Sequence, residues 1–96
     1  MHVSVRFFTI LREVTGKKEE TLKFPKGEIA VATVLRALSE RYGKDFTEYV
    51  YNSKTGEVKG FLQFFINGQS TQAEHGLETE MHDGDVLAIV PPVGGG

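Results

Sequence analysis

The printed chain closes with a segment suited to reaching into another protein. It reads Pro91-Pro92-Val93-Gly94-Gly95-Gly96. Proline fixes φ and holds the chain extended, whereas glycine has no Cβ, so such residues can thread a narrow channel. A chain that is already extended loses less entropy on binding. We expect a tail that presents the Gly96 carboxylate inside a partner's site; a frayed, idle glycine terminus is the alternative.

Few other side chains have the types and spacing that chemistry needs. With 0 cysteines, the chain has no disulfide, thiolate nucleophile, thiolate zinc site or iron–sulfur cluster. His75 and His82 lack a third ligand nearby, so solvated histidines are favoured over a metal site. Asp83 and Asp85 are typical of a turn that aspartates stabilise by local hydrogen bonds. We expect no bound metal or cofactor and no enzyme activity of the chain on its own.

Composition excludes several classes of partner. The 96 residues suffice for one domain, and 11 basic against 13 acidic residues give a net charge of −2 with no long block of either sign. Nucleic-acid binding is disfavoured because it needs a basic stripe. The longest strongly apolar stretch, 86–93, is broken by prolines, so no membrane span is expected. We expect a soluble cytoplasmic protein.

The elements that must position the tail follow from hydrophobic periodicity. Residues 3–9 alternate between apolar and polar types, which predicts a half-buried strand. A turn at 15–18 precedes a second alternating run at 20–24, which ends at Pro25 and Gly27. We expect the second strand to pair back on the first, with Arg12 and Glu13 lying at the end of the first strand.

The next segment changes period and predicts a helix. Val31, Val34, Leu35, Leu38 and Tyr42 form an apolar stripe at helical spacing. Gly43 then stands where a helix-ending glycine is expected, and no capping residue marks the start near Ala30.

The second half of the chain predicts further strands. The stretch 44–60 contains a turn signal at 52–56 and suggests a small inserted hairpin. Residues 61–66 predict an apolar strand, and Asn67-Gly68 favours a type I′ turn into a short strand from Gln69. Residues 86–90 are apolar and largely β-branched, so they predict a last strand. A place beside the first strand at the centre of the sheet would explain why both runs are so apolar, and this expected pairing rests partly on the family resemblance given below.

This order of elements predicts an α+β domain in which one helix covers one face of a small mixed sheet. The other face of the sheet would then present apolar side chains to a partner, unless the 44–60 segment folds over them. The outward set is Phe8, Phe61, Phe65, Val86, Ala88 and Val90.

Several motifs together resemble the small subunit of molybdopterin synthase. They are the runs 3–13, 66–68, 77–81, 83–85 and 91–96. The 44–60 stretch is similar to the archaeal-type branch of this family, which overlaps with small archaeal ubiquitin-like modifiers. The resemblance implies a ubiquitin-like β-grasp fold over 1–92 and a flexible glycine tail over 93–96. Ala30 departs from the family pattern, which has a capping threonine there.

The resemblance also implies a sulfur carrier. An E1-like enzyme would use ATP to adenylate the Gly96 carboxylate, and sulfur transfer would convert it into a thiocarboxylate. Inserted into the large synthase subunit, it would donate sulfur to a pyranopterin precursor of the molybdenum or tungsten cofactor. Thiamine and transfer-RNA thiolation relatives share the fold, but Pro91-Pro92 favours the molybdopterin branch.

Two alternatives stay open. A ubiquitin-like modifier would join the same activated Gly96 to a lysine of another protein, and both fates can coexist. A plain interaction domain would make no use of the tail.

Overall fold

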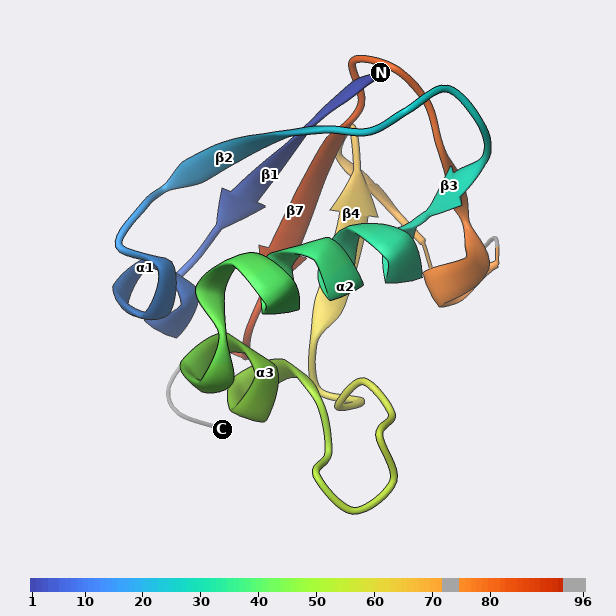
Figure 1. Ribbon diagram of the computed structural model, residues 1–96. Helices are drawn as coiled ribbons and strands as arrows, with labels where there is room; N and C mark the ends of the chain where they lie inside the picture. Colours follow the sequence, from blue (N-terminus) through green and yellow to red (C-terminus); the bar gives the residue numbers. More distant parts are fainter. Residues whose placement is uncertain (72–74, 93–96) are drawn as a thin grey trace.

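The computed structural model describes residues 1–71 and 75–92 and has an α+β fold (Figure 1). A five-stranded sheet has the order β2-β1-β7-β4-β5. Its strands are β1 (His2–Phe7), β2 (Glu19–Lys23), β4 (Gln63–Ile66), β5 (Gln69–Ser70) and β7 (Val86–Val90). A two-residue pair, β3 (Ile29–Ala30) with β6 (Glu80–Met81), lies apart from it, and a 3-10 turn, η1 (Gly76–Glu78), precedes β6.

The first and last strands lie side by side at the centre of the sheet, as the sequence predicts. β1 and β7 are parallel, with Phe7 paired with Ile89 and Val5 with Leu87. All four side chains are buried, whereas the alternate residues of β7 are half-exposed. Because successive residues of a strand point to opposite faces, this alternation sends one face into the core and the other outward.

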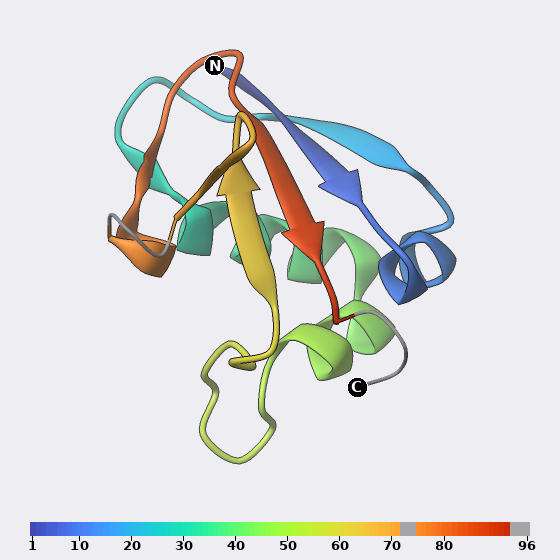
Figure 2. The same ribbon diagram turned by 180° about the vertical axis from the view of Figure 1, so that it is seen from behind.

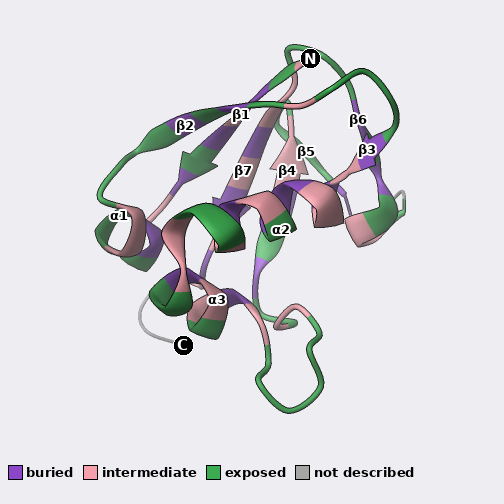
Figure 3. Cartoon of the chain, viewed as in Figure 1, coloured by how far each residue is buried: buried purple, intermediate pink, exposed green. Residues whose placement is uncertain are grey.

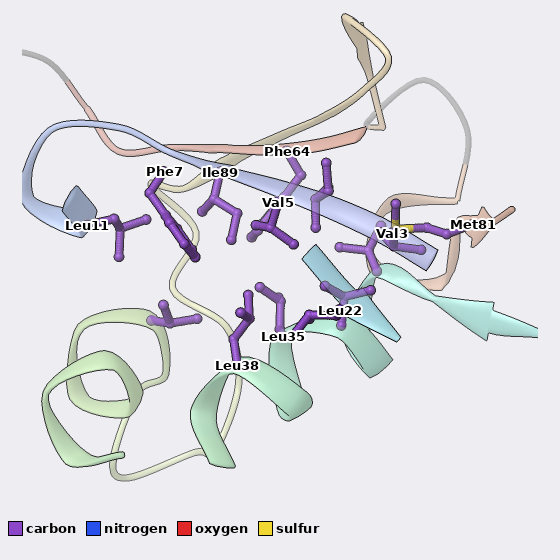
Figure 4. Packing of buried hydrophobic residues seen from close by; sticks show 14 of the residues in the cluster. Val3, Val5, Phe7, Leu11, Leu22, Leu35, Leu38, Phe64, Met81 and Ile89 are labelled. Atoms are coloured by element: carbon purple, nitrogen blue, oxygen red, sulfur yellow. The ribbon is translucent and has the colours of Figure 1, made fainter. Parts of the chain in front are cut away.

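The main helix, α2 (Val31–Tyr42), covers the inner face of the sheet (Figure 1). Val31, Val34, Leu35 and Leu38 are fully buried, so the predicted stripe is confirmed. Figure 4 shows Leu35 and Leu38 pointing from the helix toward Val5 and Ile89 of the sheet.

No side chain of the N-cap residue accepts a hydrogen bond at the start of α2, so other groups bond the free backbone groups at its ends. At the start, the Ala30 N–H donates to Thr33 Oγ1 at 3.2 Å, which is the reciprocal half of a capping box, and the Val31 N–H donates to Thr79 O at 3.1 Å. At the end, Gly43 has φ 78° and its N–H donates to Ser39 O at 2.8 Å.

A short helix follows β1 where the sequence analysis extended the strand to Thr9. β1 ends at Phe7, and α1 (Ile10–Thr15) follows, so the extended boundary is wrong and Arg12 and Glu13 lie on this helix. The buried Leu11 holds α1 against the core, and Gly16, with φ 73°, closes it as its N–H donates to Arg12 O.

The stretch 44–60 is mostly not a hairpin. Its first part forms the helix α3 (Lys44–Val50), which buries Phe46 and Val50 one helical turn apart. The expected strand pairing is reduced to a single bridge between Tyr51 and Val58 around the predicted turn. The expectation of an inserted hairpin therefore holds only for 51–58.

The Asn67-Gly68 turn between β4 and β5 agrees with the sequence. Asn67 has φ 51° and Gly68 φ 85°, the two positive values that a type I′ turn needs. Figure 3 shows that buried residues gather between the sheet and α2, while the loop after α3 is exposed. In the described ranges 1–71 and 75–92, no helix has the length and apolar character to cross a membrane.

Candidate functional site

The tail leaves the domain from the central strand. β7 ends at Val90, after which Pro91 is buried and Pro92 is half-buried. A buried proline anchors the base of the tail and fixes the direction in which the chain departs. The remaining tail residues of the sequence analysis, Val93, Gly94, Gly95 and Gly96, lie outside the described residues.

Two helices lie near the end of β7, where the tail begins. The pairing of Phe7 with Ile89 places the start of α1 at this end, and the pairing of Gln63 with Val90 places residues 59–62 there. α3 contacts both α1 and α2 below the sheet. Figure 2 shows the described chain ending between α1 and α3.

The outer face of the sheet is uncovered and partly apolar. Phe61 is 45% exposed, and the other predicted members, Phe8, Phe65, Val86, Ala88 and Val90, are half-exposed. In the view from behind, no helix lies in front of β1, β7 and β4 (Figure 2). The 44–60 segment meets this set at Phe61, where the Tyr49 ring lies 5.8 Å away between centroids.

The residues that alternate with this outward set along the strands, here called the inward set, face the core. Ile66 is half-buried, while the other members are buried: Val5, Phe7, Leu62, Phe64, Leu87 and Ile89. The strand register was therefore predicted without a slip, which is why the outward list falls on the outer face.

A row of residues crosses the middle of the outer face. Ala88 on β7 pairs with Arg6 of β1 on one side and with Phe65 of β4 on the other. Arg6 donates from Nε to Glu19 Oε1 at 3.1 Å, an exposed ion pair. The face thus combines a small apolar floor with one charged edge, which suits contact with another protein.

Three cation–aromatic contacts, made by Arg12 and Lys59, flank the base of the tail on two sides. The Arg12 guanidinium lies 5.5 Å from the Phe8 ring centroid, and Arg12 Nε donates to Phe7 O at 3.0 Å. On the other side, Lys59 Nζ lies 5.9 Å from the ring centroids of both Tyr49 and Phe61.

Sequence reasoning assigned no role to Arg12 and missed Tyr49 and Lys59. Their contacts depend on α1 and α3, which it did not predict. Aromatic residues at 49 and 61 near a lysine at 59 were the available signal. Burial raises the pKa of Tyr49, so its ring remains neutral well above physiological pH.

Asp83 and Asp85 lie in the turn that leads into β7, at the opposite end of that strand from the tail, and they hold this turn by hydrogen bonds. Asp83 Oδ1 accepts from the His2 N–H at 2.7 Å, a bond that lowers the pKa of Asp83. Asp85 accepts from the His82 N–H at 2.8 Å and from Asn67 Nδ2 at 2.9 Å. His75 and His82 are exposed. Among residues 1–71 and 75–92, no three histidine or carboxylate side chains are grouped to hold a metal.

Comparison with known proteins gives a family. The family model described as "ThiS family" matches residues 5–96. The chain is 32% identical over 96 residues to small archaeal modifier protein 3 of Haloferax volcanii, and 29% identical over 96 residues to the sulfur carrier protein CysO of Mycobacterium tuberculosis. Each match covers 100% of both chains.

Solved structures agree with the fold. The crystal structure of SAMP1 from Haloferax volcanii covers 100% of both chains with a TM-score of 0.85 and 26% identity. A Pyrococcus furiosus structure provisionally named molybdopterin converting factor, subunit 1, covers 97% of this chain and 99% of its own, with a TM-score of 0.73 and 25% identity. The Amycolatopsis orientalis BexX/CysO complex covers 98% and 99% with a TM-score of 0.73 and 30% identity. The β-grasp fold expected from the sequence is therefore confirmed.

Proposed function

Because this chain belongs to the ThiS family, a family of sulfur carriers that are not themselves catalysts, we propose that it carries sulfur on the carboxyl group of Gly96. The observation that supports this most is the place of Pro91 and Pro92, which directly follow the central strand β7, with Pro91 buried against the domain. A carrier needs a rigid body from which its end can extend into a partner, and two prolines directly after a central strand suit that need.

The proposed chemistry takes place in partners. An E1-like enzyme binds ATP, and an oxygen of the Gly96 carboxylate attacks the α-phosphorus as pyrophosphate leaves. A sulfide-equivalent donor then attacks the acyl carbon, AMP leaves, and the product is a C-terminal thiocarboxylate. Adenylation is needed because a free carboxylate is a poor electrophile. The domain contributes the position of the tail and the surfaces that the partners bind.

The finer proposal is a role as the small subunit of molybdopterin synthase. The tail would enter the large subunit, and the thiocarboxylate sulfur would pass to a pyranopterin precursor that later holds molybdenum or tungsten. Support comes from the Pro91-Pro92 pair and from the similarity to the Pyrococcus furiosus structure of that name. The outer-face residues Phe65, Ala88 and Val90 are the proposed docking patch for these partners, together with Phe8, Phe61 and Val86.

A second candidate function is protein modification. In this case the activated Gly96 would form an isopeptide bond with a lysine of a target protein. The full-length similarity to small archaeal modifier protein 3 favours it. Both fates need the same adenylate, so one protein can serve both, depending on whether sulfur or an amine attacks it.

Deletion of Gly95 and Gly96 tests the proposal. We expect the shortened protein to fold normally and to lose sulfur transfer to a pyranopterin precursor in a reaction with the large subunit, the activating enzyme and ATP. Retained transfer would refute the carrier function. Conjugates that leave a glycine remnant on target lysines, found by mass spectrometry, would establish the modifier function in its place or beside it.

A further inference from the structure

The aromatic–cation cluster of Tyr49, Lys59 and Phe61 precedes β4 and shares only Phe61 with the proposed docking patch; Tyr49 and Lys59 have no role in the function proposed above. Phe61 is 45% exposed, and Phe61 and Ile10 are the two large apolar residues that are exposed in the part of the chain that the structure describes. Ile10 begins α1 and Phe61 precedes β4, so the two stand on opposite sides of the base of the tail. Large apolar side chains left in water beside an exit point favour a protein contact there.

Within residues 1–71 and 75–92, the positive charge in this cluster has no carboxylate at ion-pair distance. Lys59 Nζ donates to Glu48 O at 2.8 Å and lies against the Tyr49 and Phe61 rings. A lysine ammonium has three N–H donors, so the bond to Glu48 O leaves two of them available to a partner. Lys44, by contrast, lies 3.8 Å from the Glu48 carboxylate, and Lys17 forms an ion pair with Glu20.

Under the proposed function, the spacing between Pro92 and Gly96 limits how far the activating enzyme can stand from the domain. Four residues follow Pro92 in the sequence. Fully extended, they span at most about 14 Å. An enzyme that adenylates Gly96 must hold the carboxylate against a nucleotide in a recess, so its surface around that recess has to approach the base of the tail within this reach. The two sides of the base, at α1 and at α3, are then contacted together.

We propose that Tyr49, Lys59 and Phe61 form a docking site for the E1-like activating enzyme, which places a carboxylate of its rim opposite Lys59 and an apolar group on Phe61. This inference rests on the proposed function and names one surface of its partner. The cation and the exposed ring select that chemistry: a carboxylate pairs with the ammonium, and the ring edge buries against an apolar side chain. The site shares Phe61 with the outer-face patch and extends beyond that patch on the α3 side of the tail through Tyr49 and Lys59.

The test measures binding of the full-length protein to the activating enzyme of the same organism by calorimetry at low and high salt. Lys59→Glu should weaken binding at least tenfold and flatten its salt dependence, because a rim charge acts through electrostatic attraction. Lys59→Arg, which keeps the charge, should bind within about twofold of the unchanged protein. Lys54→Glu is the matched control, since Lys54 is exposed in the same loop and changes the net charge equally; it should also stay within about twofold.

Two further readouts separate the possible failures. Thermal unfolding of each variant shows whether a weakly binding variant is still folded. If Lys59→Glu is unfolded, Lys59→Met replaces it, because methionine removes the charge and keeps an aliphatic side chain against the two rings. If Lys59→Glu binds as Lys54→Glu does while ATP–pyrophosphate exchange still depends on Gly95 and Gly96, the docking site is refuted and the carrier function stands. If the unchanged protein supports no exchange, the proposed function fails and this inference falls with it.

Discussion

Tyr42, in the last turn of α2, donates a hydrogen bond of 2.5 Å to the carboxylate of Glu20 on β2. The same carboxylate accepts from Lys17 Nζ at 2.9 Å and lies 3.1 Å from Arg41 Nε. Glu20 is only 9% exposed, so its charge is held by these three partners and has little contact with water. The network fastens the edge strand β2 to the end of α2.

Replacement of Glu20 by glutamine should lower the free energy of unfolding by about 1 to 3 kcal/mol, since bonds to a charged acceptor are lost. Glu19→Gln is the matched control on the same strand. Its ion pair with Arg6 is exposed, so the loss should be about 0.5 kcal/mol or less. Urea unfolding of both variants measures the difference, and equal losses would contradict the role given to Glu20.

The same network predicts a pH dependence of stability. The Tyr42 hydrogen bond, followed by that of Lys17, holds the pKa of Glu20 below its ordinary value of 4.5. A lowered pKa means that the folded state binds the proton less tightly than the unfolded chain. The stabilisation by Glu20 is therefore complete above about pH 4.5 and is lost as the pH falls through the folded pKa. Urea unfolding at stepped pH should show the unchanged protein and Glu20→Gln converging in this acidic window; a constant gap would contradict it.

Two substitutions of Asn67 separate the contributions of backbone strain and of side-chain hydrogen bonds to the stability of the turn. Asn67 Oδ1 accepts from the Val86 N–H at 3.0 Å, and its backbone has a positive φ of 51°. Asn67→Gly keeps the conformation and loses the side-chain bonds, which should cost about 1 kcal/mol. Asn67→Ala adds a left-handed alanine and should cost about 1 kcal/mol more. Chemical denaturation compares the two, and equal stability would show that the turn carries no strain.

Substitutions on the outer face of the sheet should leave the domain folded but weaken its binding to a partner. Phe65 is half-exposed on β4, so Phe65→Asp should leave a folded domain while weakening the large synthase subunit's binding at least tenfold, because it buries a charge in an apolar contact. Thr21→Asp, on the exposed edge of the same sheet, is the control and should bind normally. Surface plasmon resonance measures both; unchanged binding of Phe65→Asp would remove this face from the docking patch.

Long or strongly patterned segments were predictable from the sequence. The strands β1 and β7, the stripe of α2 and the Asn67-Gly68 turn follow from periodicity and from glycine and asparagine conformations. The pairing of β1 with β7 rested partly on the family resemblance, because the period of a strand does not say which strand lies beside it. The outward and inward sets follow from the strand period of two. The structure agrees with both sets, except that Ile66 of the inward set is half-buried and not fully buried.

Short helices were not predictable in the same way. α1 has 6 residues and buries Leu11, and α3 has 7 residues and buries two, so neither shows a repeating helical period. The run Tyr49-Val50-Tyr51 favours a strand by residue type, yet packing of Phe46 and Val50 against the core makes its first part helical. The cluster of Tyr49, Lys59 and Phe61 depends on that helix, which is why the sequence did not give it a place.

The central claim is that Gly96 is activated and receives sulfur. The most direct test is the intact mass of the full-length protein after incubation with ATP, the E1-like enzyme and a sulfur donor, followed by fragmentation to locate any change. The account predicts a gain equal to the difference between one sulfur and one oxygen atom, mapped to Gly96. An unchanged mass, while the enzyme binds the protein and forms the adenylate, would contradict sulfur carriage and direct attention to lysine conjugates.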